Sequence, residues 1–282
     1  MAQRVFIVTG GNKGIGFETA KKLCRDLKGE NAVVVITSRD KENGVQALAK
    51  LAAEGLKAEM ELLDITKKES RESFVAAIKS KYGHVDSLVN NAGFAFKKAA
   101  TEPVAVQAKV TCGINYYATR DITLDMMGLF KPGSRIVNVA SAAGEMALQE
   151  MSAELRHRLM SKSARQEDID KVVDDFIVAC EKGQQEGWPS STYGLSKAAV
   201  IALTAAWARK ADHCPSMEAC RDMVITCCCP GWCKTDLAGW EAPPLTAADG
   251  ANVVAPLALS STKQQHHGKF VRSKGIVDLS ED

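Results

Sequence analysis

Short apolar runs alternate along this chain with segments in which apolar residues recur every three or four positions. Continuous apolar runs are typical of strands covered on both faces, and they occur at residues 5–8, 32–37, 58–63, 87–90, 135–140 and 223–229, with a short strand near Phe270. The helical period predicts helices at residues 17–27, 44–53, 70–82, 103–129, 192–211 and 247–259. The alternation predicts an α/β fold with a doubly wound, Rossmann-like parallel sheet.

The alternation is interrupted between about residues 143 and 187, where a polar, charged stretch carries two further helical patterns. These patterns cover residues 152–161 and 166–182, and Gly187-Trp188-Pro189 closes the stretch. The chain contains no internal repeat and no low-complexity tract. We therefore expect residues 1–282 to form one domain that carries a helical insert.

A glycine-rich turn joins the first strand to the first helix, with the sequence Thr9-Gly10-Gly11-Asn12-Lys13-Gly14-Ile15-Gly16. Glycines allow a tight turn and a close approach of the backbone to a pyrophosphate, and a helix N-terminus offers free N–H groups to an anion. A glycine cluster alone is a weak signal. Its position between a strand and a helix favours a dinucleotide site over an ordinary glycine turn.

The end of the second strand indicates which nicotinamide cofactor is used. NAD-binding folds usually place an acidic residue there to bind the ribose 2′-hydroxyl, whereas this strand ends in Thr37-Ser38-Arg39. Arg39 can bind a 2′-phosphate, and Lys13 adds a second cation in the glycine turn. Each cation alone is equally consistent with a solvated surface, and Asp40 weakens the argument. Together the two cations favour NADPH, with Asp64 expected to bind the adenine ring.

Tyr193 and Lys197 are separated by one helical turn and therefore share a helix face. A free tyrosine has a pKa near 10, and a neighbouring ammonium is expected to lower it, so that Tyr193 can exchange a proton with a carbonyl oxygen. Ser141, just after the strand at residues 135–140, can hydrogen-bond the same oxygen. A Tyr-x-x-x-Lys pair by itself is more often a surface pair, but here it follows a dinucleotide motif.

These motifs resemble those of the short-chain dehydrogenases/reductases. The turn matches the Thr-Gly-x-x-x-Gly-x-Gly pattern of that family, residues 90–93 match its Asn-Asn-Ala-Gly stretch, and Pro230-Gly231 matches its Pro-Gly loop. The resemblance implies a catalytic tetrad of Asn115, Ser141, Tyr193 and Lys197, in which Asn115 holds a proton-relay water. It also implies a set of cofactor-binding residues: Gly10, Asn12, Lys13, Gly14, Ile15, Gly16, Arg39, Asp64, Ile65, Asn91, Ala92, Gly93, Tyr193, Lys197, Pro230, Gly231 and Thr235.

Within this family the chain is similar to the monomeric carbonyl reductases. Tyr193 follows Ser141 by 52 positions, far more than the loop of about 2–6 residues that usually joins a strand to a helix. In those reductases a helical insert covers the surface that other members use to dimerise, so the resemblance implies a monomer. The chain departs from the common pattern in the small residues Ala142 and Ala143, which suggest a roomy pocket, and in Cys233 and Lys234.

A loop at about residues 230–246 is expected to cover the substrate. It carries Trp232, Leu237 and Trp240, and aromatic walls favour flat or bulky apolar ketones and quinones, although ordinary loop packing is the alternative. The expected substrate-contacting residues are Ser141, Ala142, Ala143, Trp232 and Phe96. Phe96-Lys97-Lys98 forms either a basic rim or, more simply, a solvated surface.

Charge and composition exclude several other classes of function. With 36 Lys and Arg against 34 Asp and Glu, nothing favours nucleic-acid binding. No run of about 18 apolar residues predicts a membrane span, and the first residues do not resemble a signal peptide. Nine cysteines without a glycosylation sequon favour the cytoplasm, with Cys227–Cys229 either buried in a strand or redox-active. No metal site is predicted, and His266-His267 is expected at the surface.

The sequence thus predicts a reductase that transfers hydride from NADPH to a ketone, aldehyde or quinone, a small-molecule carbonyl substrate. One alternative is a secondary-alcohol dehydrogenase that acts on steroids, prostanoids, terpenoids or alkaloids. The other is an NADPH-binding sensor without turnover, against which the complete tetrad argues.

Overall fold

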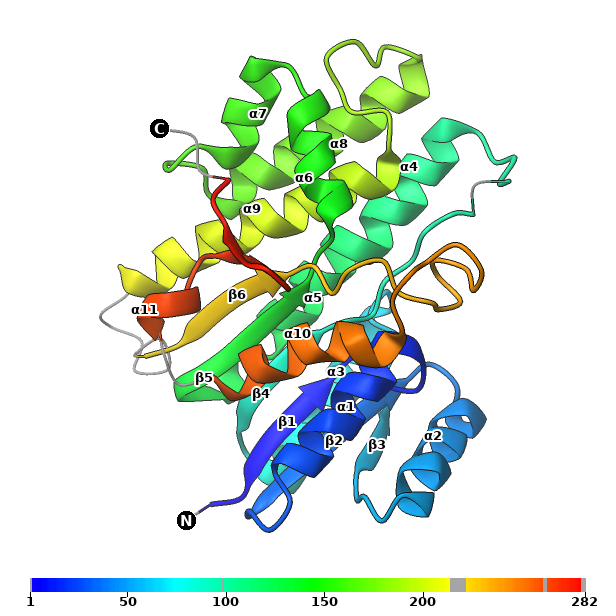
Figure 1. Ribbon diagram of the computed structural model, residues 1–282. Coiled ribbons are helices and arrows are strands. Elements are labelled where there is room, and N and C mark those ends of the chain that lie inside the picture. Colours follow the sequence, from blue (N-terminus) through cyan, green and yellow to red (C-terminus); the bar gives the residue numbers. More distant parts are fainter. Residues whose placement is uncertain (1, 98, 214–221, 261–262, 280–282) are drawn as a thin grey trace.

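The fold is a three-layer α/β sandwich in which one sheet lies between two sets of helices (Figure 1). The structure, a computed structural model, describes residues 2–97, 99–213, 222–260 and 263–279. The strands run in the order β3-β2-β1-β4-β5-β6-β7-β8, and all neighbours pair in parallel except β7 and β8. The predicted doubly wound parallel sheet is therefore confirmed. The strands are β1 (Arg4–Val8), β2 (Ala32–Ser38), β3 (Glu59–Leu62), β4 (Val85–Asn90), β5 (Phe130–Val139), β6 (Val224–Cys228), β7 (Phe270–Arg272) and β8 (Gly275–Val277).

The side chains of the central strands alternate between two cores. Val5 and Ile7 of β1 enter one core, while Phe6 and Val8 enter the other, because successive strand residues point to opposite faces. The second core is closed by α1 (Gly14–Asp26), α2 (Lys41–Ala53) and α10 (Ala247–Leu259). The first is closed by α3 (Lys68–Tyr82), α4 (Val104–Cys112), α5 (Ala118–Asp125) and α9 (Thr192–Asp212), together with the insert.

The helix predicted at residues 103–129 is divided into four elements. Between α4 and α5 lies η1 (Gly113–Tyr117), a π-helical turn, and η2 (Met127–Leu129) is a single 3₁₀ turn after α5. The predicted helical segment is therefore confirmed, but it contains a π-turn and ends in a 3₁₀ turn that the sequence did not predict. A π-turn keeps the residues helical and changes only which carbonyl each N–H reaches, so the hydrophobic period does not reveal it.

The insert forms a layer of helices outside α4 and α9 and occupies the upper part of Figure 1. It contains α7 (Ala153–Met160) and α8 (Gln166–Lys182), close to the predicted positions, and also α6 (Ala142–Glu150), which the periodicity did not predict. The apolar stripe of α8 is buried as expected, with Ile169, Val172, Val173 and Phe176 inside. A short helix α11 (Lys263–His266) and the edge strand β8 were also not predicted.

Helices α6 and α9 approach each other closely at Gly144. A Cβ atom on this glycine would lie 2.7 Å from the backbone carbon of Lys197 and 2.8 Å from the nitrogen of Ala198. Only a glycine permits this contact, and it brings the start of α6, where Ser141 lies, against the first turns of α9. The contact therefore fixes the distance between the two segments that carry Ser141 and Tyr193.

Candidate active site

The glycine turn after β1 is shaped by residues that lie far away in the sequence. Gly10 and Gly14 have φ values of +61° and +57°, which favour glycine, and the Nδ2 group of Asn91 donates hydrogen bonds to the carbonyls of Thr9 (2.9 Å) and Gly10 (3.3 Å). A Cβ on Gly16 would lie 2.3 Å from that same Nδ2. The turn and the segment after β4 are therefore locked together, as their separate motifs suggested.

The residues of the turn fit an anionic group such as a pyrophosphate. Helix α1 begins at Gly14 without a side-chain cap, and its first turn contains no acidic residue. The N–H groups of that turn thus carry the positive end of the helix dipole with no carboxylate to satisfy them. Lys13 immediately precedes the helix and is largely exposed. Thr235 and Ile15 lie beside the turn, against Gly14 and Gly250 respectively.

Arg39, at the end of β2, is exposed and next to Asp64. Burial alone would raise the pKa of Asp64, but hydrogen bonds from Thr66 and the charge of Arg39 hold the pKa below its ordinary value. Asp40 does not compete for this role, because its carboxylate caps α2 by accepting a 2.8 Å hydrogen bond from the Asn43 N–H. The position that would favour NAD is thus filled by a cation.

Ser141, Tyr193 and Lys197 meet where β5 ends and α9 begins. Ser141 caps α6, and its hydroxyl also hydrogen-bonds the Tyr193 side chain. The Nζ atom of Lys197 lies 5.7 Å from the centre of the Tyr193 ring and donates a 2.7 Å hydrogen bond to the Val139 carbonyl. The three side chains predicted from their spacing therefore share one site.

The pKa of Tyr193 differs from the sequence-based expectation. Burial raises it to about 12, the hydrogen bond with Ser141 lowers it in part, and Lys197 contributes no depression. Burial also lowers the pKa of Lys197 to about 8. The prediction that the Lys197 ammonium lowers the Tyr193 pKa is thus wrong for the protein by itself. The reason is that burial of the phenol outweighs other effects, and the Lys197 ammonium donates its hydrogen bond to the Val139 carbonyl.

Asn115 lies inside the π-turn η1 and is fully buried. Its side chain joins the segment after β4 to α9: Oδ1 accepts a 2.8 Å hydrogen bond from the Phe94 N–H, and Nδ2 donates to the Phe94 carbonyl and to the Ser196 hydroxyl. A Cβ on Gly93 would lie 3.2 Å from Asn115 Oδ1 and 3.7 Å from Lys197 Nζ. The predicted tetrad is thus contiguous with residues 91–93.

The loop after β6 is fastened by two cations. Lys13 forms a 2.7 Å ion pair with Asp236, and Lys97 donates hydrogen bonds to the carbonyls of Asp236 and Leu237. Lys97 is therefore a loop anchor, which corrects the idea of a free basic rim, whereas Lys98 lies outside the described residues. Asp236 was not anticipated, because its partner Lys13 is distant in the sequence.

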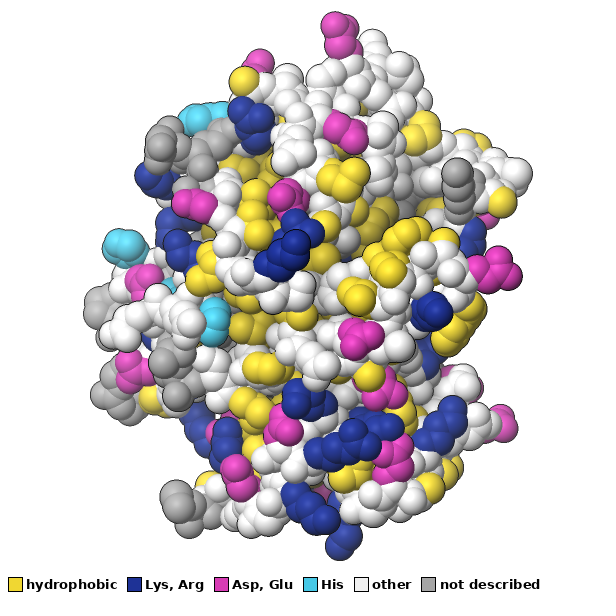
Figure 2. Space-filling view, in the orientation of Figure 1, with side chains coloured by type: hydrophobic (Ala, Val, Ile, Leu, Met, Phe, Trp, Pro, Cys, Tyr) yellow, Lys and Arg dark blue, Asp and Glu magenta, His cyan; other side chains and the backbone are white. Residues whose placement is uncertain are grey.

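Aromatic and aliphatic side chains are exposed around this loop. Trp232 and Trp240 are 56% and 62% exposed, Met146 of α6 is exposed as well, and Phe96 packs edge-on against Phe94. Figure 2 shows apolar side chains gathered across the middle of this face, between the insert and the loop after β6. Ala142 and Ala143 form the first turn of α6 beside Ser141, and Pro230 and Gly231 begin the loop.

The other candidates for reactive side chains are the cysteines of β6, of which Cys228 lies close enough to Lys197 to influence its pKa, and His267. Cys227 and Cys228 are buried in β6, and burial raises the pKa of the Cys227 thiol to about 12, so the prediction of buried strand cysteines is confirmed. His266 and His267 are half-buried, and His267 accepts a hydrogen bond from the Ile225 N–H, so the pair does not lie freely at the surface as expected. Within the described ranges, no His, Cys, Asp and Glu side chains are grouped to hold a metal ion, and no helix is both long and apolar enough to cross a bilayer.

Comparison with known proteins agrees with this arrangement. The family model for short chain dehydrogenases matches residues 4–153. The human protein carbonyl reductase (NADPH) 1 is 38% identical over 275 residues, which cover 96% of this chain and 97% of the human one. Among solved structures, salutaridine reductase from Papaver somniferum is similar with a TM-score of 0.80 and 29% identity, covering 95% of this chain and 99% of that chain.

A second solved structure, menthone neomenthol reductase from Mentha piperita, has a TM-score of 0.77 and 27% identity, covering 96% of this chain and 99% of that chain. The residues that the family model matches include the glycine turn, and the similarity to the human carbonyl reductase covers nearly the full length of both chains. The chain belongs to the short-chain dehydrogenase family.

Proposed function

We propose that the protein is an NADPH-dependent carbonyl reductase that acts on ketones, aldehydes or quinones. The observation that carries the proposal is the contact between Ser141 and Tyr193 beside Lys197 and Gly93, next to a glycine turn suited to an anion. The names of the human and plant relatives, all reductases, support the same reaction class.

NADPH, when bound, supplies the hydride that reduces the carbonyl carbon. Ser141 donates a hydrogen bond to the carbonyl oxygen, where negative charge develops. Tyr193, whose raised pKa keeps it protonated at neutral pH, passes its phenolic proton to that oxygen. The transfer is favourable because an alkoxide is a far stronger base than a phenolate. Lys197 lies beside the Tyr193 ring and holds the geometry of this pair.

Arg39 and Lys13 supply the preference for NADPH over NADH. Both are exposed cations at the end of β2 and before α1, and a guanidinium binds phosphate in a bidentate manner. Asp64 and Ile65 would hold the adenine, Asn12 and residues 91–93 would line the phosphate and ribose, and Thr235 would contact the carboxamide. Asn115 would hold the water of the proton relay.

The test follows NADPH oxidation by its absorbance, with a generic quinone and a panel of ketones. Tyr193→Phe should abolish turnover yet bind NADPH nearly as well as the parent, because it loses only the proton donor. Tyr82→Phe is a matched control, because the Tyr82 hydroxyl donates its hydrogen bond to Glu59 of β3. Turnover by Tyr193→Phe at the parental rate would refute the assignment.

A second candidate is a dehydrogenase of secondary alcohols among terpenoids or alkaloids, which the likeness to the two plant reductases favours. The same assay run backwards, with NADP and a panel of cyclic alcohols, distinguishes it by the ratio of forward to reverse kcat/KM. A sensor without turnover would bind NADPH and oxidise none of it with any substrate.

The assembly and location form part of the same proposal. Helix α8 packs over α4 and α9, the helices that the resemblance associates with dimerisation, so we expect a monomer. The cytoplasm remains the expected location on the ground of the cysteine content. The single domain of residues 1–282, with an insert at about 143–187 and a substrate loop at about 230–246, agrees with this. A dimer in size-exclusion chromatography with light scattering would contradict it.

A further inference from the structure

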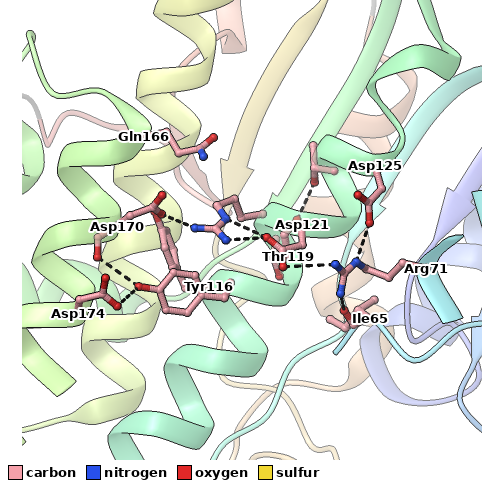
Figure 3. A network of polar contacts seen from close by, with 12 residues as sticks. Ile65, Arg71, Tyr116, Thr119, Asp121, Asp125, Gln166, Asp170 and Asp174 are labelled. Atoms are coloured by element: carbon pink, nitrogen blue, oxygen red, sulfur yellow. Dashed lines mark hydrogen bonds and ion pairs between the residues drawn. The ribbon is translucent and has the colours of Figure 1, made fainter. Parts of the chain in front are cut away.

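The insert contacts the π-turn that contains Asn115 through two tyrosines, Tyr116, which is buried, and Tyr117, which is half-buried. Tyr116 and Tyr117 directly follow Asn115, and both hydroxyls bond residues of α8, as Figure 3 shows for Tyr116. Tyr116 donates a 2.7 Å hydrogen bond to the carboxylate of Asp170, and Tyr117 donates a 2.5 Å hydrogen bond to Asp174. Tyr117 also lies 3.2 Å from the Asp170 carbonyl. Both residues after Asn115 are thus tied to one helix of the insert.

Asp170 is a charged group held among partners rather than a solvated surface acid. Its side chain is only 22% exposed, and the guanidinium of Arg120 lies 2.9 Å from the oxygen that accepts from Tyr116. Tyr116 is completely buried. Burial and the hydrogen bond to Asp170 raise the Tyr116 pKa, so the hydroxyl stays a donor at all physiological pH values. The bond is therefore a permanent, charge-assisted one.

The network continues from the π-turn to the region expected to bind adenine. Arg120 bonds Asp121, Asp121 lies 3.4 Å from Arg71, and Arg71 forms a 2.7 Å ion pair with Asp125 (Figure 3). The other end of the Arg71 guanidinium donates a 3.1 Å hydrogen bond to the carbonyl of Ile65. Ile65 immediately follows Asp64. A continuous chain of polar contacts thus runs from the insert through α5 and α3 to the segment after β3.

A π-turn needs such support because it is rare and strained relative to an α-helix. In η1 the Ala118 N–H reaches the Gly113 carbonyl, five residues back. Gly113, at the start of this turn, has no neighbour within 4 Å of the position that a Cβ would take, so no side-chain contact holds this end of the turn. Without the tyrosine anchors, the segment at residues 113–117 could relax toward regular α-helix, which would rotate Asn115 away from Phe94 and Ser196.

We propose that Asp170, through the Tyr116 hydroxyl, is a positioning residue that holds the π-turn so that Asn115 faces the catalytic residues. The insert then has a role in catalysis besides covering a surface. The inference rests on the proposed reductase function for its kinetic consequence, and on the contacts of η1 alone for its structural one.

The test compares Asp170→Ala with Asp170→Asn and with Asp175→Ala. Asp170→Ala removes the acceptor, and a displacement of about 1 Å at a catalytic group can cost about 100-fold, so kcat should fall about 10- to 100-fold. KM and the NADPH dissociation constant, measured by fluorescence titration, should change little, because Asn115 binds neither ligand directly. Asp170→Asn keeps an oxygen for Tyr116 and should recover most of the activity.

Asp175→Ala is the matched control on the same helix. Asp175 pairs with Arg158 within the insert and does not contact η1, so its loss should leave kcat at the parental value. Hydrogen exchange supplies a readout that needs no turnover. Amides of residues 113–119 should exchange faster in Asp170→Ala than in the parent and in Asp175→Ala.

Tyr116→Phe keeps the test valid if Asp170→Ala does not fold, since it deletes one hydroxyl and leaves Asp170 paired with Arg120. Folded Tyr116→Phe with parental kcat and parental exchange at residues 113–119 would overturn the inference. The proposed function fails separately, when Tyr193→Phe matches the parent. Faster exchange in Asp170→Ala without any loss of kcat would also overturn the positioning role.

Discussion

Replacing Gly16 by alanine tests whether the glycine turn and Asn91 form one unit. In an ordinary helix interior this change would stabilise the protein by about 1 kcal/mol. Here the new Cβ would lie 2.3 Å from Asn91 Nδ2 and 2.5 Å from the Gly10 carbonyl, far inside contact distance. The overlap should cost about 1–3 kcal/mol, and each of the two displaced Asn91 hydrogen bonds about 1 kcal/mol.

The net expectation is a destabilisation of about 2–4 kcal/mol, which for a chain of this size lowers Tm by about 3–7 °C. NADPH binding should weaken as well, because the backbone that faces the pyrophosphate must move. Differential scanning calorimetry with and without NADPH measures both effects. Gly128→Ala is the control, since a Cβ there meets nothing within 4 Å. A Tm for Gly16→Ala equal to that of the control would refute the reasoning.

Three further changes test the cofactor site and the pKa of Lys197. Arg39→Asp should weaken NADPH binding by about 10- to 100-fold through loss of a bidentate phosphate contact, and should favour NADH. Competitive fluorescence titration measures both affinities, and an unchanged preference would contradict the role of Arg39. Lys13→Met should weaken NADPH but not NADH, while its exposed ion pair with Asp236 changes stability by less than about 1 kcal/mol. Lys197→Met should raise the free energy of unfolding at pH 7 by about 1–2 kcal/mol, because burial lowers the Lys197 pKa to about 8 and so disfavours the charged form in the folded protein. The same substitution should abolish turnover. The unfolded chain keeps the Lys197 proton up to its ordinary pKa of 10.5, so the gain in unfolding free energy should shrink as the pH rises from 8 to 10.5. Urea titrations measure this gain, and a gain that grows with pH would contradict the reasoning.

Much of the fold could be predicted from the sequence, because the hydrophobic pattern of a helix and the residues that cap its ends indicate the same boundaries. Helix α8 lies at the predicted residues because its apolar stripe repeats regularly and Gly183 ends it in the left-handed conformation. Helix α10 does so because Thr246 and Asp249 form a reciprocal cap. Helix α6 was missed because it packs through small residues such as Gly144 rather than through a stripe of large ones.

The sequence predicted which residues come together, but not the pKa values of their side chains. Glycine, Asn, Ser, Tyr and Lys stand at spacings that a nicotinamide site requires, and the fold brings Gly93, Asn115 and Lys197 within contact. The raised Tyr193 pKa depends on burial by distant segments, which no local spacing reveals. The pairing of Lys13 with Asp236 joins residues more than two hundred positions apart, so only the folded chain shows it.

The backbone contact at Gly144 limits how substrate scope can be redesigned. Any side chain there would push the start of α9, and with it Lys197, away from its place. Libraries meant to narrow or widen the pocket should therefore vary the two alanines before it and the tryptophans of the neighbouring loop, and leave position 144 untouched. The side chains beside Ser141 can therefore be varied, whereas the close contact between Gly144 and the backbone of α9 must be kept.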